Sequence, residues 1–146
     1  VAPKANGMIP QNQQVILLEI GAWLNVNGEA IYGTRPWNVF GEGPTKQEKS
    51  GMFLDKITYT SKDVRYTKKG GAIYATILGW PGNDMEIILN SFSEEVLGED
   101  LPEIKNLSIL GHNENIEFKQ TNEGLKFITP DKEIDNKAFV VKIETH

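Results

Sequence analysis

Charged residues are distributed very unevenly along this chain of 146 residues. They make up 24% of the sequence, yet residues 1–41 contain only four of them: Lys4, Glu19, Glu29 and Arg35. A free-standing segment of this size normally has a solvated face with charges to match. We therefore expect other protein to cover the first third of the chain. The chain also begins without Met and without a signal-like segment, which we interpret as a fragment of a longer protein.

The remaining composition excludes several classes of protein. A hydrophobic content of 39%, with 14 Gly and 7 Pro, is typical of a globular domain rather than a collagen-like or disordered chain. No apolar run of about 18 residues occurs, so we expect no membrane partner. The net charge of −5 argues against nucleic acid as a partner. The absence of Cys excludes disulfides, thiolate metal sites and a Cys nucleophile.

Apolar residues at helical spacing predict a single convincing helix, Gln11–Val26. Ile16, Ile20 and Trp23 recur on one face, and further apolar residues widen this stripe. Asn27-Gly28 is predicted to end the helix, because Gly accepts a left-handed conformation. The residues that follow, 29–45, are rich in Gly and aromatic side chains and follow neither helical nor strand periodicity. We interpret them as an ordered connector that packs through its aromatic rings.

The rest of the chain has the pattern of β-strands. Residues 63–67 and 72–79 flank Lys68–Gly71, which predicts a β-hairpin with a four-residue loop. The last strand is predicted to direct Phe139, Val141 and Ile143 inward. Six or seven short strands at this spacing predict an antiparallel β-sandwich, so the fold class is mainly β. The polar segment 45–51 is the best candidate for a domain boundary, which divides the chain into residues 1–45 and 46–146.

The chemistry of individual residues offers no catalytic centre. His112 lies in a turn and His146 is the last residue, so both are interpreted as surface residues rather than bases. No metal-ligand spacing and no phosphate-binding loop occurs, so we expect no metal and no cofactor. Glu29 is a lone acid in an apolar stretch. We favour a structural role for it, in an ion pair or hydrogen bonds with Arg35 or with backbone N–H groups.

Tyr32, Arg35, Trp37 and Trp80 are the candidate contact residues, either for carbohydrate or for another domain. Aromatic faces suit the C–H side of a pyranose ring, and the Arg35 guanidinium could stack on the Trp37 indole. The alternative is that each aromatic ring packs in the core.

A long segment of the sequence resembles a known enzyme family. Ile20–Trp37 closely resembles the segment that ends the catalytic barrel in α-L-fucosidases of glycoside hydrolase family 29. Further motifs match this family, and some of them recur in its bacterial members: Val1–Pro3, Gly7, Ile9, Pro10, Gly41–Thr45, Asp63–Thr67 and Leu78–Pro81.

The resemblance implies the C-terminal part of a retaining exo-hydrolase that removes α-L-fucose from glycans. In this family an Asp nucleophile and a carboxylic acid/base act on a (β/α)8-like barrel, which a C-terminal β-sandwich follows. No position here matches those catalytic residues, so the fragment alone is predicted to be inactive. Residues 1–45 would be the last loop, helix and wrap of the truncated barrel, and residues 46–146 the accessory sandwich. A bacterial protein that is periplasmic or secreted is expected.

The expected partners are the missing barrel of the same protein and, for the full-length enzyme, a fucosylated glycan. Without the barrel, the apolar face of the helix Gln11–Val26 lacks its cover. We expect the isolated fragment to dock this helix on its own sandwich or to self-associate through it. Two other functions stay open: a carbohydrate-binding module that uses Trp37 or Trp80 as a stacking platform, and a purely structural interaction domain.

Overall fold

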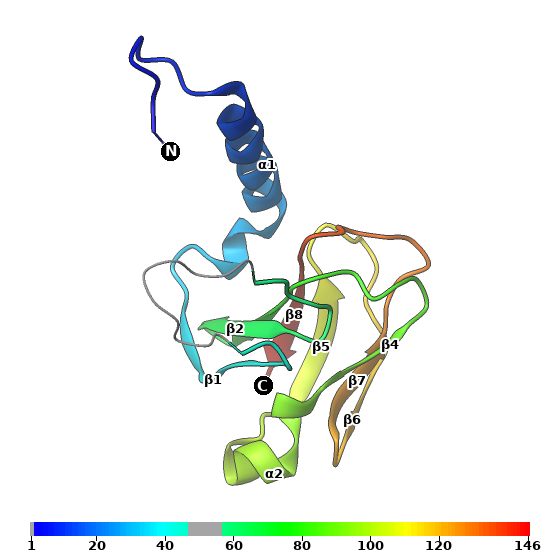
Figure 1. Cartoon of the computed structure of the whole chain (residues 1–146). Coiled ribbons are helices and arrows are strands. Elements are labelled where there is room, and N and C mark those ends of the chain that lie inside the picture. Colours follow the sequence, from blue (N-terminus) through cyan, green and yellow to red (C-terminus); the bar gives the residue numbers. More distant parts are fainter. Residues whose placement is uncertain (1, 47–56) are drawn as a thin grey trace.

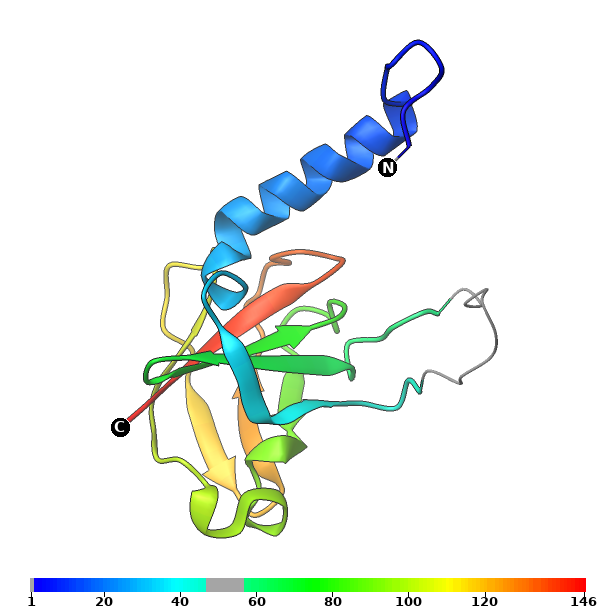
Figure 2. The ribbon, with the colours of Figure 1, turned by 90° about the vertical axis from the view of Figure 1, so that its left-hand side faces the viewer.

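A computed structural model describes residues 2–46 and 57–146 of the chain. Helix α1 (Gln11–Asn27) and the short 3-10 helix η1 (Gly28–Ala30) come first and project from a body of β-sheets (Figures 1 and 2). The strands are β1 (Arg35–Glu42), β2 (Val64–Lys69), β3 (Ala72–Ile77), β4 (Glu86–Leu89), β5 (Ile104–Ile109), β6 (Phe118–Thr121), β7 (Gly124–Ile128) and β8 (Phe139–Thr145). Between β4 and β5 lie three short helices: η2 (Asn90–Phe92), α2 (Glu94–Leu97) and η3 (Gly98–Asp100).

Two antiparallel sheets form a sandwich, which confirms the predicted fold class. One sheet has five strands in the order β1-β2-β3-β8-β5, and the other has three in the order β4-β7-β6. Every strand pair is antiparallel. The inward-facing side chains predicted for the last strand are confirmed, since Phe139, Val141 and Ile143 are fully buried between the sheets.

The helix is confirmed almost to the residue, but its end has a different cause from the predicted one. Gly28 keeps a right-handed conformation, with φ of −60°, and the chain continues directly into η1. The Tyr32 ring lies over the backbone there, and an added Cβ would lie 2.8 Å from Tyr32 Cε2, so a larger residue would have to displace this exposed ring. Glycine at this position accommodates the close approach of Tyr32 rather than a left-handed turn.

The hairpin β2–β3 is confirmed with a tighter turn than the sequence predicts. Lys68 pairs with Ile73 and Lys69 with Ala72, so the two lysines belong to the strand. Only two residues, at positions 70 and 71, connect the strands. A hairpin with a two-residue turn matches the twist of the strands well.

The connector that the sequence predicts at residues 29–45 contains a strand, β1. Its pairing with β2 shifts between Pro36 and Gly41, where a wide bulge leaves several β1 residues without a partner in β2. The bulge interrupts the alternation of side chains, which is why no strand period is visible in the sequence. The five-stranded sheet thus includes residues before position 45. The proposed boundary segment 45–51 lies largely outside the described residues, so the division at residue 45 stays a prediction.

The core lies between the two sheets and is centred on a cluster of aromatic rings. The Trp37 ring stacks on Phe92 at 4.6 Å between centroids, and Tyr66 meets Trp37 edge-on at 5.1 Å. Phe92 is held by η2, whose backbone N–H groups at Asn90 and Ser91 donate to the Glu42 carboxylate. This contact joins the end of β1 to the opposite sheet.

Candidate functional site

The C-terminal end of α1 and η1 lies on the outer face of the five-stranded sheet. Ala30, Ala72, Tyr74 and Val140 form a second buried cluster there, and the Trp23 ring packs against it. β8 is an interior strand, between β3 and β5, and its side chains alternate between the two clusters: Val140 faces the helical segment, while its neighbours face the main core. The sandwich is therefore packed against the helical segment on a face opposite its own core.

Hydrogen bonds from different parts of the sandwich fix this contact. Trp23 Nε1 donates to the Ala138 carbonyl at 2.7 Å, and Thr67 Oγ1 donates to the Ala30 carbonyl at 2.7 Å. Lys69 Nζ donates to the carbonyl of Glu29 at 3.2 Å. The sandwich supplies two donors from β2 and one acceptor from the segment before β8. These groups therefore hold the helical segment at separate points.

Ion pairs add to the contact between α1, η1 and the sheet. Lys142 Nζ lies 3.2 Å from Glu29 Oε1, and Lys137 Nζ lies 2.9 Å from Glu19 Oε2. Burial alone would lower the pKa of Lys142, but the hydrogen bond and charge of Glu29, together with Tyr74 and Glu144, outweigh burial, and the pKa is raised above its ordinary value. Burial, together with the Glu29 carboxylate, also raises the pKa of Tyr74. Glu29 thus has the structural role that the sequence favours, with Lys142 rather than Arg35 as its partner.

The rest of α1 leaves its apolar side chains in solvent. Leu18 is 73% exposed, and only Asn27 is fully buried in this helix. The large apolar side chains exposed on α1 and the loop before it are Met8, Ile9, Val15, Ile16, Leu17, Leu18, Ile20 and Val26. Successive helical residues are about 100° apart, so Leu18 and Ile20 lie on nearly opposite sides. Apolar residues all round a helix are typical of one that is buried in a larger protein.

A groove, the α1 groove, lies between α1 and residues 134–139. It has a volume of about 580 Å³. Ile20, Trp23 and Val26 line it from the helix, and Phe139 lines it from the sandwich. Asn27 is 4% exposed and also lines the groove. Its Nδ2 donates to the Trp23 carbonyl at 3.1 Å, whereas its Oδ1 has no hydrogen-bond partner among the described residues.

The four predicted contact residues do not form one site. Tyr32 and Arg35 are exposed near η1 and at the start of β1. Trp37 is 8% exposed and belongs to the core, which is the alternative that the sequence left open for it. Trp80 is half-buried, and its ring meets Phe139 edge-on at 5.0 Å, on a different part of the sandwich. Its buried position removes Trp37 from the candidates for a stacking platform, because Phe92 covers one face of the indole.

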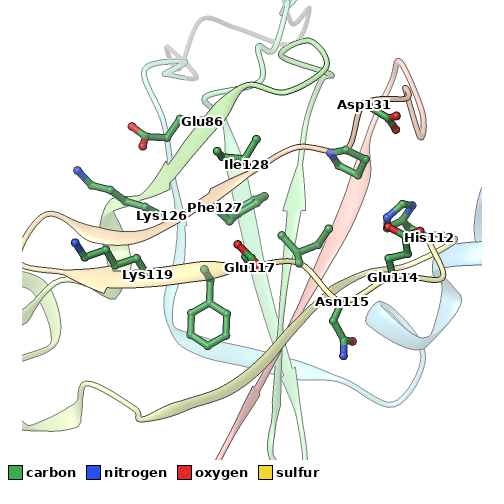
Figure 3. Close-up of a pocket in the computed structure, with 13 residues that line it drawn as sticks. Glu86, His112, Glu114, Asn115, Glu117, Lys119, Lys126, Phe127, Ile128 and Asp131 are labelled. Atoms are coloured by element: carbon green, nitrogen blue, oxygen red, sulfur yellow. The ribbon is translucent and has the colours of Figure 1, made fainter.

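A shallow pocket of about 610 Å³ lies on the three-stranded sheet and the loop before it (Figure 3). Lys119 and Lys126 are direct neighbours on β6 and β7, and Lys126 pairs with Glu123 in the turn between these strands. Glu86 from β4 lies beside them, while His112 lies at the opposite end of the pocket (Figure 3). None of the four predicted contact residues lines this pocket. Its mixture of charges is that of a solvated surface.

The described residues contain no group of three His, Cys, Asp or Glu side chains that could hold a metal ion. Helices in the described ranges are all too short or too polar to cross a membrane. The most distinctive features of the described residues are the apolar helix α1 and its anchored end. They define an antiparallel β-sandwich with an attached helix whose apolar side chains are largely exposed.

Comparison with known proteins identifies the family. The family model for the alpha-L-fucosidase C-terminal domain matches residues 56–144, which is more than half of the chain. The chain belongs to this family, and the resemblance inferred from the sequence is confirmed. Tissue alpha-L-fucosidase of Homo sapiens is 39% identical over 83 residues, which are 57% of this chain and 14% of that protein. The chain thus spans only a small part of the length of its curated relatives.

Solved structures of alpha-L-fucosidases are also similar to this chain. A Thermotoga maritima alpha-fucosidase in complex with a mechanism-based inhibitor has a TM-score of 0.71 and 27% identity. That match covers 99% of this chain, α1 included, and 29% of the solved chain. A GH29 alpha-L-fucosidase of Bacteroides thetaiotaomicron shares the fold, with a TM-score of 0.60 at 15% identity over 99% of this chain and 27% of that one. The similarity in structure therefore begins well before the residues that the family model matches.

Sequence reasoning missed several residues of the contact between α1 and the sandwich. Thr67, Ala138 and Lys142 meet the helical segment from positions that are far away in sequence. Nothing in their local pattern marks them. A signal did exist for Asn27, because a polar side chain in the last turn of an apolar helix must find a hydrogen-bond partner if it is buried.

Proposed function

We propose that this chain is the C-terminal accessory part of a retaining α-L-fucosidase, and that the catalytic barrel of the same polypeptide packs around α1. The observation that carries the proposal is the exposure of apolar side chains on opposite sides of α1. Solvent exposure of such a surface is unfavourable by about 25 cal/mol per Å² of apolar area. Membership of the fucosidase C-terminal family supports a barrel as the cover.

The sandwich would hold the last barrel helix in place. Its contacts with Trp23, Ala30 and Glu29 restrain the C-terminal end of that helix from the outer side. In the full-length enzyme, exo-hydrolysis of α-L-fucosyl linkages in glycans would take place on the barrel. This chain alone is inactive in the proposal. Tyr32 and Arg35 are proposed contacts with the barrel, and Trp80 is a candidate for contact with carbohydrate or another domain.

The proposal extends to the source and location of the protein. A bacterial protein that is periplasmic or secreted is supported by the motifs shared with bacterial fucosidases and by the solved bacterial structures with the same fold. Curated relatives from mammals belong to the same family, so the family by itself does not select the bacterial source.

The test begins with the reading frame upstream of residue 1. The chain and the complete reading frame are produced separately, and hydrolysis of p-nitrophenyl α-L-fucoside is measured for each. The expected result is turnover by the complete protein and none by the chain. Turnover by the repurified chain, or an upstream sequence without a barrel, would overturn the proposal. Binding of the isolated chain on a glycan array would instead favour a carbohydrate-binding module.

A further inference from the structure

Two asparagines in this chain, Asn6 and Asn27, are followed directly by glycine, and they differ in their surroundings. Asparagine is among the thermally labile residues of proteins, because the backbone nitrogen of the next residue can attack its side-chain amide carbon. A glycine in the next position leaves this approach open, since it carries no side chain. The two sites share the same local chemistry, so a difference in their reactivity comes from the fold.

Asn6 lies in an exposed turn before α1. Its Oδ1 accepts a hydrogen bond from the backbone N–H of Met8 at 3.1 Å, which is the arrangement of an Asx turn. This bond holds the side-chain amide over the backbone that contains the Gly7 nitrogen. The same N–H group can stabilise the negative charge that develops on Oδ1 when the amide carbon is attacked. An added Cβ at Gly7 would have no other described residue within 4 Å, so the site is open to water.

The Gly7 nitrogen is held by a single hydrogen bond of the turn. Its N–H donates to the Lys4 carbonyl at 2.8 Å, and both residues are exposed. Hydrogen bonds in exposed turns open at little cost in free energy. The nitrogen therefore becomes available without unfolding of the rest of the chain.

Asn27 has the opposite surroundings. It is 4% exposed, and its Nδ2 donates to the Trp23 carbonyl at 3.1 Å. The backbone N–H of Gly28, which would have to attack, donates to the Leu24 carbonyl. Reaction at Asn27 requires that both hydrogen bonds break and that the buried side chain leaves the contact between α1 and the sandwich. Such an opening costs much more free energy than the opening of an exposed turn, and the rate falls with the population of the open state.

We propose that Asn6 is a site of spontaneous deamidation in the folded chain, and that the fold protects the same Asn-Gly pair at position 27. The Gly7 nitrogen loses its proton to water and forms a bond to Asn6 Cγ. The bond from Cγ to the side-chain nitrogen breaks, and this nitrogen takes up a proton from water and leaves as ammonia. The resulting five-membered cyclic imide then adds water. Breakage of its bond between Cγ and the Gly7 nitrogen gives aspartate, whereas breakage of the bond between the backbone carbonyl carbon of residue 6 and the same nitrogen gives isoaspartate.

The two products have different effects on the turn. Aspartate keeps an oxygen in the place of Oδ1, so it can still accept from the N–H of Met8. Isoaspartate carries the main chain through the side chain and inserts a methylene group, so it disrupts the hydrogen bonds between Lys4 and Met8 and between Gly7 and Lys4. Either product makes the chain one charge more negative than its present net charge of −5. The modification thus adds a carboxylate before α1 and, as isoaspartate, loosens the segment that leads into the helix. This inference does not depend on the proposed function.

Peptide mapping by mass spectrometry measures the reaction, because each conversion raises the mass of a peptide by one unit. Cleavage after glutamate places Asn6 and Asn27 in different peptides, since Glu19 lies between them. The chain is incubated in mildly alkaline buffer, once folded and once in urea, and the two sites are followed together with Asn113. Asn113 is the control for the glycine, because it is exposed and precedes Glu114.

In the folded chain, Asn6 should convert faster than Asn27 and Asn113 by about tenfold or more. In urea, Asn6 and Asn27 should convert at similar rates, because both precede glycine and the fold no longer separates them. Asn6 should convert at a similar rate in both states. The variant Asn6→Gln should lose the acidic species that ion-exchange chromatography separates, because its longer side chain would have to close a larger ring, and it should keep the circular dichroism spectrum of the original chain.

Three results would overturn the proposal. The first is conversion at Asn6 that is about tenfold slower in the folded chain than in urea, which would show that the turn protects the site. The second is equal conversion at Asn6 and Asn27 in the folded chain, which would show that burial of Asn27 has no effect. The third is equal conversion at Asn6 and Asn113, which would remove the role of the glycine.

Discussion

Asp63 provides a sharp test of how the edge of the sheet is held. Its side chain is fully buried directly before β2, and it accepts four hydrogen bonds from two threonines. Oδ1 accepts from Thr45 N at 3.0 Å. Oδ2 accepts from Thr60 N at 2.8 Å and from the hydroxyls of Thr45 and Thr60 at 2.7 and 3.1 Å. One carboxylate thus joins two segments on either side of residues 47–56.

The substitution Asp63→Asn keeps the shape and removes one acceptor. Whichever way the amide is placed, its NH2 group faces a backbone N–H, either that of Thr45 or that of Thr60. The threonine hydroxyls can reverse and accept, but the backbone donor cannot. One buried N–H is left unpaired, which should lower the free energy of unfolding by about 1–3 kcal/mol. For a chain of this size, that corresponds to a fall in Tm of roughly 3–12 °C.

The difference in stability between the original chain and Asp63→Asn should depend on pH. Burial alone would raise the pKa of Asp63, but the hydrogen bonds from Thr45 and Thr60 together outweigh it, and the pKa is lowered from 3.8. A carboxyl whose pKa is lower in the folded state stabilises the fold above its unfolded pKa, and this contribution disappears as the pH falls through the folded value. The difference in stability between the original chain and Asp63→Asn should therefore be full at pH 7 and shrink below about pH 4.

Urea unfolding followed by Trp fluorescence, at several pH values between 3 and 7, measures this difference. Asp100→Asn is the control, because Asp100 is exposed on η3. An Asp63→Asn variant as stable as the original chain at pH 7 would refute the reasoning. So would a difference in stability that grows as the pH falls.

Three further predictions concern the helix and the core. Trp23→Phe removes the donor to the Ala138 carbonyl and should lower the free energy of unfolding by about 0.5–1.5 kcal/mol in urea titrations; no change would contradict an anchored helix. Leu18→Glu should reduce self-association of the isolated chain in analytical ultracentrifugation, because it places a charge on the exposed apolar surface of α1. The free energy of unfolding should change by less than about 0.5 kcal/mol. Undiminished association would exclude α1 as its cause. Phe92→Ala should lower the free energy of unfolding by about 3–5 kcal/mol, measured by circular dichroism, because its ring is fully buried against Trp37. Phe40 is exposed, so the control Phe40→Ala should leave the free energy of unfolding almost unchanged.

Local patterns determined much of this protein before its tertiary structure was considered. The helical spacing of apolar residues predicted α1. Alternation in residues 63–67, followed by a turn and the apolar run 72–79, predicted the hairpin β2–β3, and alternation predicted the buried side of β8. The shortage of charge in residues 1–41 indicated a surface that needs a cover, and α1 does leave its apolar residues in solvent. These features are encoded by neighbours in the sequence, so a single sequence is enough to find them.

Contacts between distant residues were decided only by the tertiary structure. The strand β1 has no visible period in the sequence, because its side chains do not alternate across the bulge. Likewise, no local pattern indicates that Glu29 pairs with Lys142 or that Trp23 bonds to Ala138, since the fold alone brings these residues together. The buried Oδ1 of Asn27, which has no hydrogen-bond partner among the described residues, belongs with them: the sequence supplies the amide, and the packing of α1 on the sandwich determines that water does not reach it.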